Sequence, residues 1–249
     1  MIKHNQRFDA FFSRIKQKTL DELLVISKDK NLDIKKKEDK TFVTIVDLAI
    51  SHLVKKEIAN FDSSMFFHSE EDQLSELQFP CAILDPIDGT KEFVQGPAEC
   101  VLSLAIVYSP RFDDPRNQAF IFNPLTGFEM RSSSSFIFHY ELNHKIEKKE
   151  KMKKNPSIMV SRSEWKKGLF NGERKREDLQ VMPRGSIAFK LALLAAGGCD
   201  KIISKKPKNI WDICAGTILC YQRGIYFYQN GKKNAIIDNK IYNNDLVWE

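Results

Sequence analysis

The sequence predicts a mixed α/β fold in two parts. Segments with apolar residues at helical spacing alternate with short runs rich in β-branched and aromatic residues, which is the pattern of mixed helices and strands. No internal repeat with a period of about 20 to 50 residues is visible, which argues against a solenoid. A serine run at 132–135 and a lysine-rich stretch at 145–154 indicate a boundary between the two parts, near 140–156.

The first part is predicted to begin with two helices. Apolar residues recur at roughly helical spacing from 7 to 28, so this segment is expected to form an amphipathic helix. A lysine-rich loop at 35–40 follows. Apolar residues at helical spacing from 48 to 58 then predict a second helix with Asp47 near its start. Capping of that helix is one role for Asp47.

Strands are expected after these helices. Short apolar runs at 65–67, 81–84, 101–108 and 120–122 have the length and composition of strands. The segment 122–127, Phe-Asn-Pro-Leu-Thr-Gly, is typical of a hairpin turn, so a further strand is expected after it.

The second part begins with a strand-like run at 157–161. Two apolar helices are predicted farther along the chain. One covers 187–196 and ends at a Gly-Gly pair, and the other covers 209–221 and ends near Gly224.

Composition is that of a soluble globular protein. The chain has 249 residues, of which 42% are hydrophobic and 29% charged, and this length is enough for a substantial core. No stretch approaches the ~20 apolar residues that span a bilayer, and the charged first residues do not resemble a signal peptide, so we expect a cytoplasmic protein. The five cysteines form no Cys-x-x-Cys motif, which favours buried free thiols.

The formal net charge of +6 favours anionic partners. Its sign alone does not choose among a phosphorylated metabolite, nucleic acid and a membrane surface. Much of the lysine lies at 145–154, where no aromatic residue is interleaved to stack on bases. A solvated loop is therefore expected there, and no stable nucleic-acid complex.

The segment 85–90, Asp-Pro-Ile-Asp-Gly-Thr, is the most informative motif. It follows the apolar run at 81–84, and Pro86, which has no backbone N–H, is expected to end the strand directly after Asp85. Three residues span at most about 10 Å and turn chemistry shortens that distance, so Asp85 and Asp88 can share ions. Their carboxylate oxygens suit Mg²⁺ better than zinc.

A helix is expected to begin at Thr90. Its first N–H groups would face the two carboxylates and accept a phosphate. The alternative is a turn in which Asp85 and Asp88 only cap that helix, because short motifs carry a false-positive risk.

Further acids stand at the ends of other predicted elements. Glu70 follows the strand at 65–67, and Asp212 stands at the start of an apolar helix beside Trp211. Taken singly, Glu70 has the alternative role of a surface turn residue and Asp212 that of a helix cap. Taken together, five acids in such positions predict a site for divalent metal and phosphate. They are Asp47, Glu70, Asp85, Asp88 and Asp212.

These motifs resemble those of the inositol monophosphatase superfamily of Mg²⁺-dependent, lithium-sensitive phosphatases. The resemblance rests on four segments in the family's order and spacing, at 44–47, 69–72, 85–93 and 211–216, and extends from the first helix to about Gly224. Within the superfamily the sequence is most similar to the CysQ type of 3'(2'),5'-bisphosphate nucleotidase. Ser-Glu-Glu-Asp stands at 69–72, and Lys-Glu-Phe follows the Gly-Thr pair.

Two positions depart from the nucleotidase pattern. Glu164 stands where these enzymes tend to carry histidine, which bears on nucleoside recognition. Cys214 replaces a small residue, usually alanine or threonine, and this change should be tolerated.

The resemblance implies a layered α/β/α/β/α sandwich with the active site between two lobes. Combined with the lysine-rich stretch, it implies an N-terminal metal-binding lobe at 1–140, a loop at 141–156 and a C-terminal lobe at 157–249. The C-terminal lobe would contribute Asp212 and the substrate loops.

The resemblance also implies the roles of individual residues. One Mg²⁺ ion would bind to Glu70, Asp85 and the Ile87 carbonyl, and a second to Asp85, Asp88 and Asp212. A third ion, held more weakly, would lie near Asp47 and Glu70. The catalytic residues would be Thr90, Asp47 and Glu70, with Thr90 oriented by Asp47 to help activate the attacking water. N–H groups of Gly89 and Thr90 would cradle the phosphate. Paired ions stabilise the attacking and leaving oxygens of an in-line displacement.

Substrate choice is expected to lie in the second lobe. The predicted substrate contacts are Gly89, Thr90, Ser161, Gly185, Ser186, Lys205 and Asp212, with Lys36 and Lys190 as possible additions. A solvated lysine is the alternative for Lys36. Lys205 stands where inositol phosphatases present a glutamate to the ring hydroxyls, and a cation there favours a second phosphate over a neutral polyol.

We therefore expect a monomer or homodimer that hydrolyses a small phosphorylated substrate, 3'-phosphoadenosine 5'-phosphate, to AMP and phosphate. An inositol or sugar monophosphatase of the same superfamily is the first alternative. A non-catalytic anion-binding protein is the second.

Overall fold

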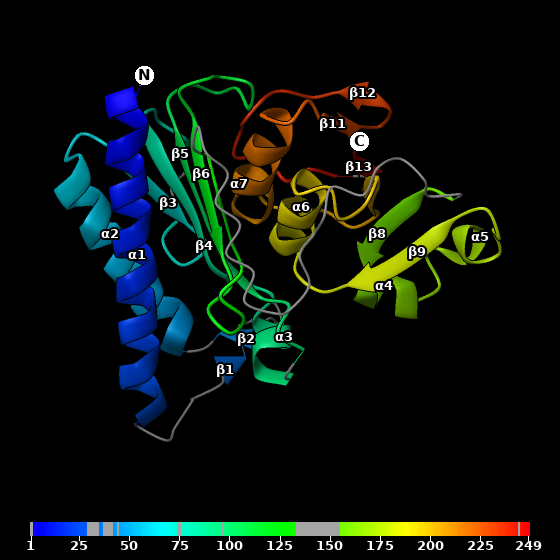
Figure 1. Ribbon diagram of the computed structural model, residues 1–249, viewed down its shortest axis with the longest axis horizontal. Helices are drawn as coiled ribbons and strands as arrows, with labels where there is room; N and C mark the ends of the chain where they lie inside the picture. Colours follow the sequence, from blue (N-terminus) through cyan, green and yellow to red (C-terminus); the bar gives the residue numbers. More distant parts are fainter. Residues whose placement is uncertain are drawn as a thin grey trace.

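The computed structural model describes residues 2–28, 35–36, 42–43, 45–73, 76–95, 97–132, 155–243 and 245–249. The chain forms five layers (Figure 1). Two helices cover one face of a five-stranded sheet, two more helices fill the middle, and a six-stranded sheet with short helices at its outer edge completes the stack. This arrangement confirms the expected α/β/α/β/α sandwich. The predicted boundary at 141–156 lies mostly outside the described residues, so the division into lobes stays a prediction.

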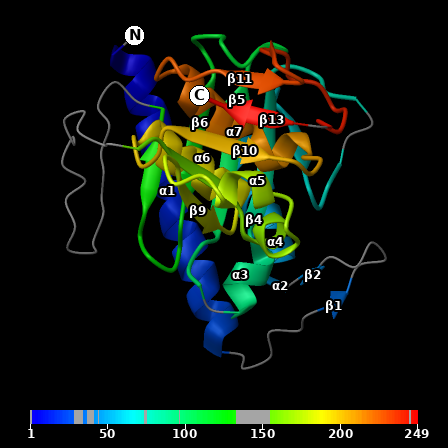
Figure 2. The same ribbon diagram turned by 90° about the vertical axis from the view of Figure 1, so that its right-hand side faces the viewer.

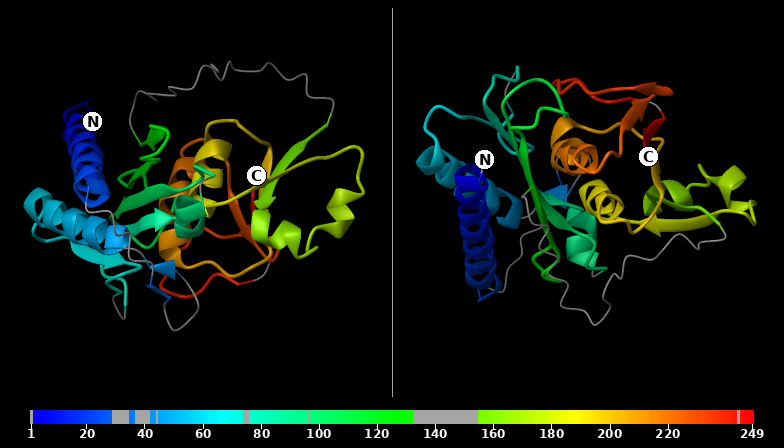
Figure 3. Two further views of the ribbon diagram at one scale, coloured as in Figure 1. Left: turned by 90° about the horizontal axis from the view of Figure 1, so that it is seen from below. Right: turned by 45° about the horizontal axis from the view of Figure 1, so that its top comes forward.

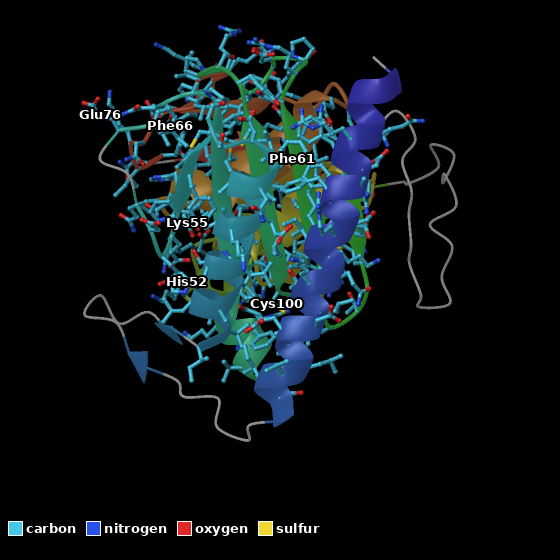
Figure 4. All side chains as sticks on the ribbon, turned by 90° about the vertical axis from the view of Figure 1, so that its left-hand side faces the viewer. His52, Lys55, Phe61, Phe66, Glu76 and Cys100 are labelled. Atoms are coloured by element: carbon cyan, nitrogen blue, oxygen red, sulfur yellow. The ribbon has the colours of Figure 1, made fainter. Side chains whose placement is uncertain are left out.

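The outer helices α1 (Ile2–Lys28) and α2 (Ile45–Phe61) lie side by side over the first sheet (Figure 4). Phe8 and Phe11 are buried against α2 and the sheet, because apolar residues at this spacing share one helix face. The ring of Phe61, at the end of α2, lies 4.4 Å from the ring of Phe11. Both predicted helices of the first part are therefore present.

The first sheet has the order β3-β4-β5-β6-β7. β3 and β4 run parallel, and the other neighbours are antiparallel. Its strands are β3 (Phe66–Ser69), β4 (Cys81–Asp88), β5 (Val101–Val107), β6 (Gln118–Phe122) and β7 (Glu129–Arg131). The smaller elements nearby are β1 (Lys35–Lys36), β2 (Phe42–Val43) and α3 (Thr90–Gln95). The predicted strands and the hairpin are all found in this sheet.

The central strand β4 buries both of its faces. Ala82 packs against the outer helices and Ile83 against the middle ones, because successive side chains of a strand point to opposite faces. The prediction that Pro86 ends the strand is wrong. Pairing with β5 continues from Asp85 to Asp88 across a shift in register. Proline lacks the N–H for one ladder bond, so it produces a bulge here rather than a strand end.

The middle layer consists of α6 (Ile187–Ala195) and α7 (Ile210–Tyr221), which lie between the two sheets (Figure 3). They confirm the two helices predicted for the second part. Gly216 of α7 lies against Leu191 of α6, where a Cβ atom would overlap the leucine side chain. A glycine at this position lets the two helices approach closely.

The second sheet has the order β12-β11-β13-β10-β8-β9 and faces the viewer in Figure 2. Its strands are β8 (Ser157–Ser161), β9 (Gln180–Arg184), β10 (Lys201–Ser204), β11 (Phe227–Gln229), β12 (Lys232–Lys233) and β13 (Leu246–Trp248). The short outer helices are α4 (Arg162–Lys166) and α5 (Asn171–Arg174). Of these elements only β8 was predicted, because periodicity is hard to see in segments of two to five residues.

Two predictions from composition concern the interior and the membrane. The cysteines are all buried and free, as predicted: Cys81, Cys100, Cys199, Cys214 and Cys220. Within the described ranges, no helix combines the length and the apolar content needed to cross a bilayer.

Candidate active site

Three acids from two separate elements converge at one point. Asp85 and Asp88 come from β4, and Asp212 comes from the first turn of α7. One carboxylate oxygen from each lies within 4.8 Å of the other two. Three anions this close repel one another, and a bound cation would remove the repulsion. The geometry therefore brings together Asp85, Asp88 and Asp212, the three acids predicted to share one ion.

Asp85 is deeply buried, with 2% of its surface exposed. Among the described residues, its Oδ1 atom has no hydrogen-bond partner. Burial and four neighbouring carboxylates raise the pKa of Asp85 well above its usual value. These neighbours are Glu70, Asp88, Asp212 and Asp47. A buried oxygen without a donor is costly, and a cation would satisfy it.

The five acids singled out in the sequence thus influence one another in the structure. Asp47 is buried in the first turn of α2. Glu70 directly follows β3, and its N–H donates to the carbonyl of Leu84 at 3.2 Å. The parallel pairing of β3 with β4 therefore brings Glu70 to the part of β4 that carries Asp85.

Asp88 is held by the N-terminal end of α6. Its Oδ2 atom accepts hydrogen bonds from the Ser186 hydroxyl at 2.6 Å and from the Ala188 N–H at 2.5 Å. Ser186 also caps α6 by accepting a hydrogen bond from the Phe189 N–H at 3.0 Å. Ser186 is a predicted substrate contact, and in this structure its hydroxyl donates to a carboxylate of the first sheet.

Asp212 combines a capping role with a place among the acids. Its Oδ2 atom accepts a hydrogen bond from the Asn209 N–H at 2.8 Å. Burial and the Asp88 carboxylate raise the pKa of Asp212 to about 7, although Lys208 acts in the opposite direction. Helix capping, the alternative for Asp212, is present and does not exclude a metal role.

The turn after β4 depends on glycine. Gly89 has a φ of 91°, and a Cβ atom there would lie 2.8 Å from the carbonyl oxygen of Glu99. α3 begins at Thr90, whose hydroxyl donates to the Ile87 carbonyl at 3.0 Å. Two predicted site residues, Thr90 and Ile87, therefore share one turn. The predicted orientation of Thr90 by Asp47 stays a prediction.

Ser161 and Gly185, two predicted substrate contacts, lie at one edge of the second sheet. Ser161 ends β8 and caps α4, accepting a hydrogen bond from the Glu164 N–H. Gly185 directly follows β9, and β9 pairs in parallel with β8 so that Arg184 is opposite Ser161. The two residues are therefore neighbours, although they come from different strands.

Lys205 already has partners in and beside α5. Its Nζ atom donates to the Leu169 carbonyl at 2.7 Å and lies 3.5 Å from the Glu173 carboxylate. It also lies 4.6 Å from the centre of the Phe170 ring. The predicted role of Lys205 as the cation for a second phosphate stays a prediction, and it would compete with these contacts.

The two additional lysines differ in how they are held. Lys190 is buried, and its Nζ atom donates to the carbonyls of Gly185 at 2.8 Å and Ser186 at 3.0 Å. Burial lowers the pKa of Lys190 to about 8. Lys36 lies in β1, and its side chain falls outside the described part of the chain.

Glu164, which departs from the nucleotidase pattern, has a structural role here. It is fully buried, and its carboxylate accepts hydrogen bonds at 3.0 to 3.2 Å from the loop that follows β10. The donors are the Ser204 hydroxyl and the N–H groups of Lys205 and Lys206. Glu164 therefore stabilises the segment that leads into α7 and Asp212.

Sequence reasoning missed a group of charged residues beside the site. Glu99 forms ion pairs with Arg162 and Arg184, which lie 63 and 85 positions farther along the chain. The sequence carries no local signal for such pairs, because each partner is an ordinary charged residue in its own segment.

The residues present fit a divalent cation. Three carboxylates converge, one of their buried oxygens lacks a donor, and all the candidate ligand atoms are oxygens. Such oxygen-only sets suit hard cations such as Mg²⁺.

Comparison with known proteins agrees with this site. The sequence matches the model of the inositol monophosphatase family over residues 4–245. The 3'(2'),5'-bisphosphate nucleotidase CysQ of Buchnera aphidicola is 23% identical over 232 residues, which is 85% of this chain and 81% of that protein. The fructose-1,6-bisphosphatase/inositol-1-monophosphatase of Thermotoga maritima is 26% identical over 215 residues, covering 86% of this chain and 82% of that protein.

A solved structure shares the fold. The IMPase of Thermotoga maritima matches with a TM-score of 0.76 at 22% identity, over 98% of this chain and 92% of that one. The family match spans nearly the whole sequence, and the acids of the family's motifs meet at one point. This chain belongs to the inositol monophosphatase family of phosphatases.

Proposed function

We propose that this protein is a Mg²⁺-dependent phosphomonoesterase that hydrolyses 3'-phosphoadenosine 5'-phosphate to AMP and phosphate. The proposal rests on the convergence of one carboxylate oxygen each from Asp85, Asp88 and Asp212 within 4.8 Å, together with a buried Asp85 oxygen that accepts no hydrogen bond from the described residues. A protein that used these acids only as helix caps would gain nothing from bringing them together.

The proposed metal ligands are Glu70, Asp85, the Ile87 carbonyl, Asp88 and Asp212. Bound there, Mg²⁺ would stabilise the attacking and leaving oxygens of the displacement and lower the pKa of the attacking water. In this structure the Ile87 carbonyl accepts the Thr90 hydroxyl, so metal binding and the position of Thr90 are expected to be linked.

The proposed work of the protein's own groups is to bind and orient. Gly89 directly precedes α3 and Thr90 begins it, and the N–H groups of these two residues are assigned to the phosphate. Thr90 and Asp47 are assigned to orienting the attacking water. Ser186 holds the Asp88 carboxylate at 2.6 Å, so the ligand set is preorganised before substrate arrives.

Two observations support a bisphosphate nucleotide as the substrate. The sequence is similar to a CysQ nucleotidase along most of its length. A lysine, Lys205, occupies the position where inositol phosphatases present a glutamate. The first alternative, a sugar or inositol monophosphatase, is supported by the similarity to the bifunctional Thermotoga maritima enzyme.

A phosphate-release panel tests the substrate. Purified protein with Mg²⁺ is offered 3'-phosphoadenosine 5'-phosphate, inositol 1-phosphate and fructose 1,6-bisphosphate, with an EDTA control and a lithium arm. We expect the highest kcat/KM for the nucleotide and inhibition by lithium. Turnover of inositol 1-phosphate without turnover of the nucleotide would favour the first alternative. Absence of turnover for all of the phosphates offered would favour the second alternative, a non-catalytic anion-binding protein.

A pair of lysine variants tests the second phosphate. Lys205→Ala is expected to raise KM about tenfold for the bisphosphate, because a charge-assisted contact to the second phosphate is lost, and to leave KM unchanged for 3'-AMP, which has no second phosphate. Lys201→Ala is the matched control, since it removes an ion pair with Glu249 at the other end of β10. An unchanged KM for the bisphosphate in Lys205→Ala would remove this lysine from the substrate site.

A further inference from the structure

We propose that Glu99 is a positioning residue that fixes the Asp88 carboxylate by clamping the segment Gly185–Ser186 against the turn at Gly89. This inference rests on the proposed function, because it concerns the metal site assigned to Asp88. Glu99 lies between α3 and β5 and contacts neither substrate nor metal in the proposed arrangement.

Glu99 binds three donors of the second lobe. It is 8% exposed, and its carboxylate accepts the Gly185 N–H at 2.6 Å and the Arg184 guanidinium at 3.0 Å. The Arg162 guanidinium is its third partner. Burial alone raises the pKa of Glu99, but these donors together lower it below the usual value. Glu99 is therefore ionised, and its charge is matched within the protein.

The side chain of Glu92 lies against Gly185 from a second side. A Cβ atom at Gly185 would lie 2.5 Å from Cγ of Glu92, so this position has room for glycine only. Arg162 also lies 3.7 Å from the Glu92 carboxylate, which joins both acids to the same guanidinium. Two acids of the first lobe thus enclose a single residue of the second.

Ser186 connects Gly185 to Asp88 in the proposed metal site. Its φ is 31°, a left-handed value that a serine adopts only under constraint. Glu99 holds the preceding residue, and the Ser186 hydroxyl donates to Asp88 at 2.6 Å. The contacts therefore form a continuous chain from Glu99 through Gly185 and Ser186 to Asp88.

The backbone of Glu99 also lies close to the turn at Gly89. A Cβ atom added to Gly89 would lie 2.8 Å from the Glu99 carbonyl oxygen and 3.2 Å from Cβ of Ser186. Glu99 and Ser186 both pack against the residue that follows Asp88. The residue that follows Asp88 is thus enclosed by the backbone of Glu99 and by Ser186, whose hydroxyl donates to the Asp88 carboxylate.

The physical consequence concerns metal affinity. Without the Glu99 charge, Gly185 is free to move and Ser186 can relax from its strained φ, which removes a donor from Asp88. Partners that orient a metal ligand typically change metal affinity about 10- to 100-fold when they are mutated. A residue that only joined the lobes would change stability and leave metal affinity unaltered.

Isothermal titration calorimetry of Mg²⁺ binding to the full chain tests the inference without measuring activity. Glu99→Gln keeps the shape and removes the charge, and we expect Mg²⁺ binding about tenfold weaker. Glu129→Gln is the matched control, because Glu129 is also a buried glutamate paired with an arginine, Arg131, but in β7 beside α1. Its Mg²⁺ affinity should stay within about twofold of wild type.

A combination with Ser186→Ala tests the route. If Glu99 acts through Ser186, adding Glu99→Gln to Ser186→Ala should weaken Mg²⁺ binding by less than about twofold more, whereas independent effects would multiply. Arg184→Ala replaces a half-exposed partner and serves as a milder variant should Glu99→Gln fail to fold, with binding expected to be about threefold weaker.

The outcomes separate the two proposals. Normal Mg²⁺ affinity in folded Glu99→Gln, with measurable binding in wild type, would overturn the role of Glu99 and leave the proposed function standing. Equal weakening in Glu99→Gln and Glu129→Gln would also overturn it, as a general stability effect. Absence of Mg²⁺ binding in wild type would overturn both.

Discussion

Two of the buried charge clusters in the described part of the chain have opposite character. In the acid cluster, Asp85, Asp88 and Asp212 approach within 4.8 Å, and one buried oxygen has no donor. In the β7 cluster, formed by Lys16, Glu129 and Arg131, both oxygens of the Glu129 carboxylate contact a cation.

The difference separates stability from function. In the β7 cluster the Glu129 carboxylate is paired with Lys16 and Arg131, and these contacts join α1 to the first sheet, so the ion pairs contribute to folding. In the acid cluster, burial and neighbouring carboxylates raise the pKa of Asp85 and of Asp212, so their charged forms oppose folding until a cation binds. A concentration of like charges that no neighbouring cation balances is typical of a functional site.

Exchanging one acid for its amide in each cluster should give the largest contrast. Asp85→Asn removes a proposed metal ligand, and we expect kcat to fall about 10³-fold or more. Glu129→Gln should change kcat by less than about twofold, because it lies outside the proposed site. Phosphate release with saturating Mg²⁺ measures both. A similar loss of kcat in the two variants would show that the two clusters do not differ in their importance for activity.

The same two variants should have the opposite order in their effect on stability, with Glu129→Gln the more damaging of the two. Glu129→Gln breaks a buried ion pair and is expected to lower the free energy of unfolding by about 3 kcal/mol. Asp85→Asn should raise the free energy of unfolding of the metal-free protein, because it removes a repelling charge. Urea unfolding in EDTA measures both effects. A destabilised Asp85→Asn would mean that this carboxylate has a stabilising partner after all.

Mg²⁺ should stabilise only the protein with an intact acid cluster. At a concentration 100 times Kd, binding adds about 2.7 kcal/mol to the free energy of unfolding. For a chain of this size that corresponds to a rise in Tm of about 5 to 10 °C. Thermal unfolding with and without Mg²⁺ tests this for wild type, Asp85→Asn and Glu129→Gln. Asp85→Asn is the variant expected to lose most of the rise.

A smaller effect should appear in the pH dependence of the metal-free protein. The pKa of Asp212 is raised to about 7, so the folded state binds its proton more tightly than the unfolded state. The stability from this group is fully present below about pH 4 and is lost as the pH rises through about 7. The difference in unfolding free energy between wild type and Asp212→Asn, measured in EDTA from pH 4 to 8, should follow this curve. A difference that does not vary with pH would show that the pKa of Asp212 is not raised in the folded protein.

The acid cluster was more predictable than the β7 cluster. Asp85 and Asp88 stand in one short turn motif, so their proximity follows from chain geometry. The prediction for Pro86 was wrong because a bulge allows the strand to continue past a proline. Nothing in the sequence indicated that Lys16 and Glu129 would meet, since they are separated by 113 positions and carry no motif.

The sequence by itself determined the main helices and strands and the chemical type of the site. Helical spacing and apolar runs depend on neighbouring residues, and the turn at 85–90 carries two of the proposed metal ligands and the proposed phosphate loop in one segment. Only the tertiary structure decided that Ser186 holds Asp88 across 98 positions and that Lys205 is already paired with Glu173. Such contacts arise from packing α6 and α7 between two sheets, and no local pattern encodes which distant side chains that packing brings together.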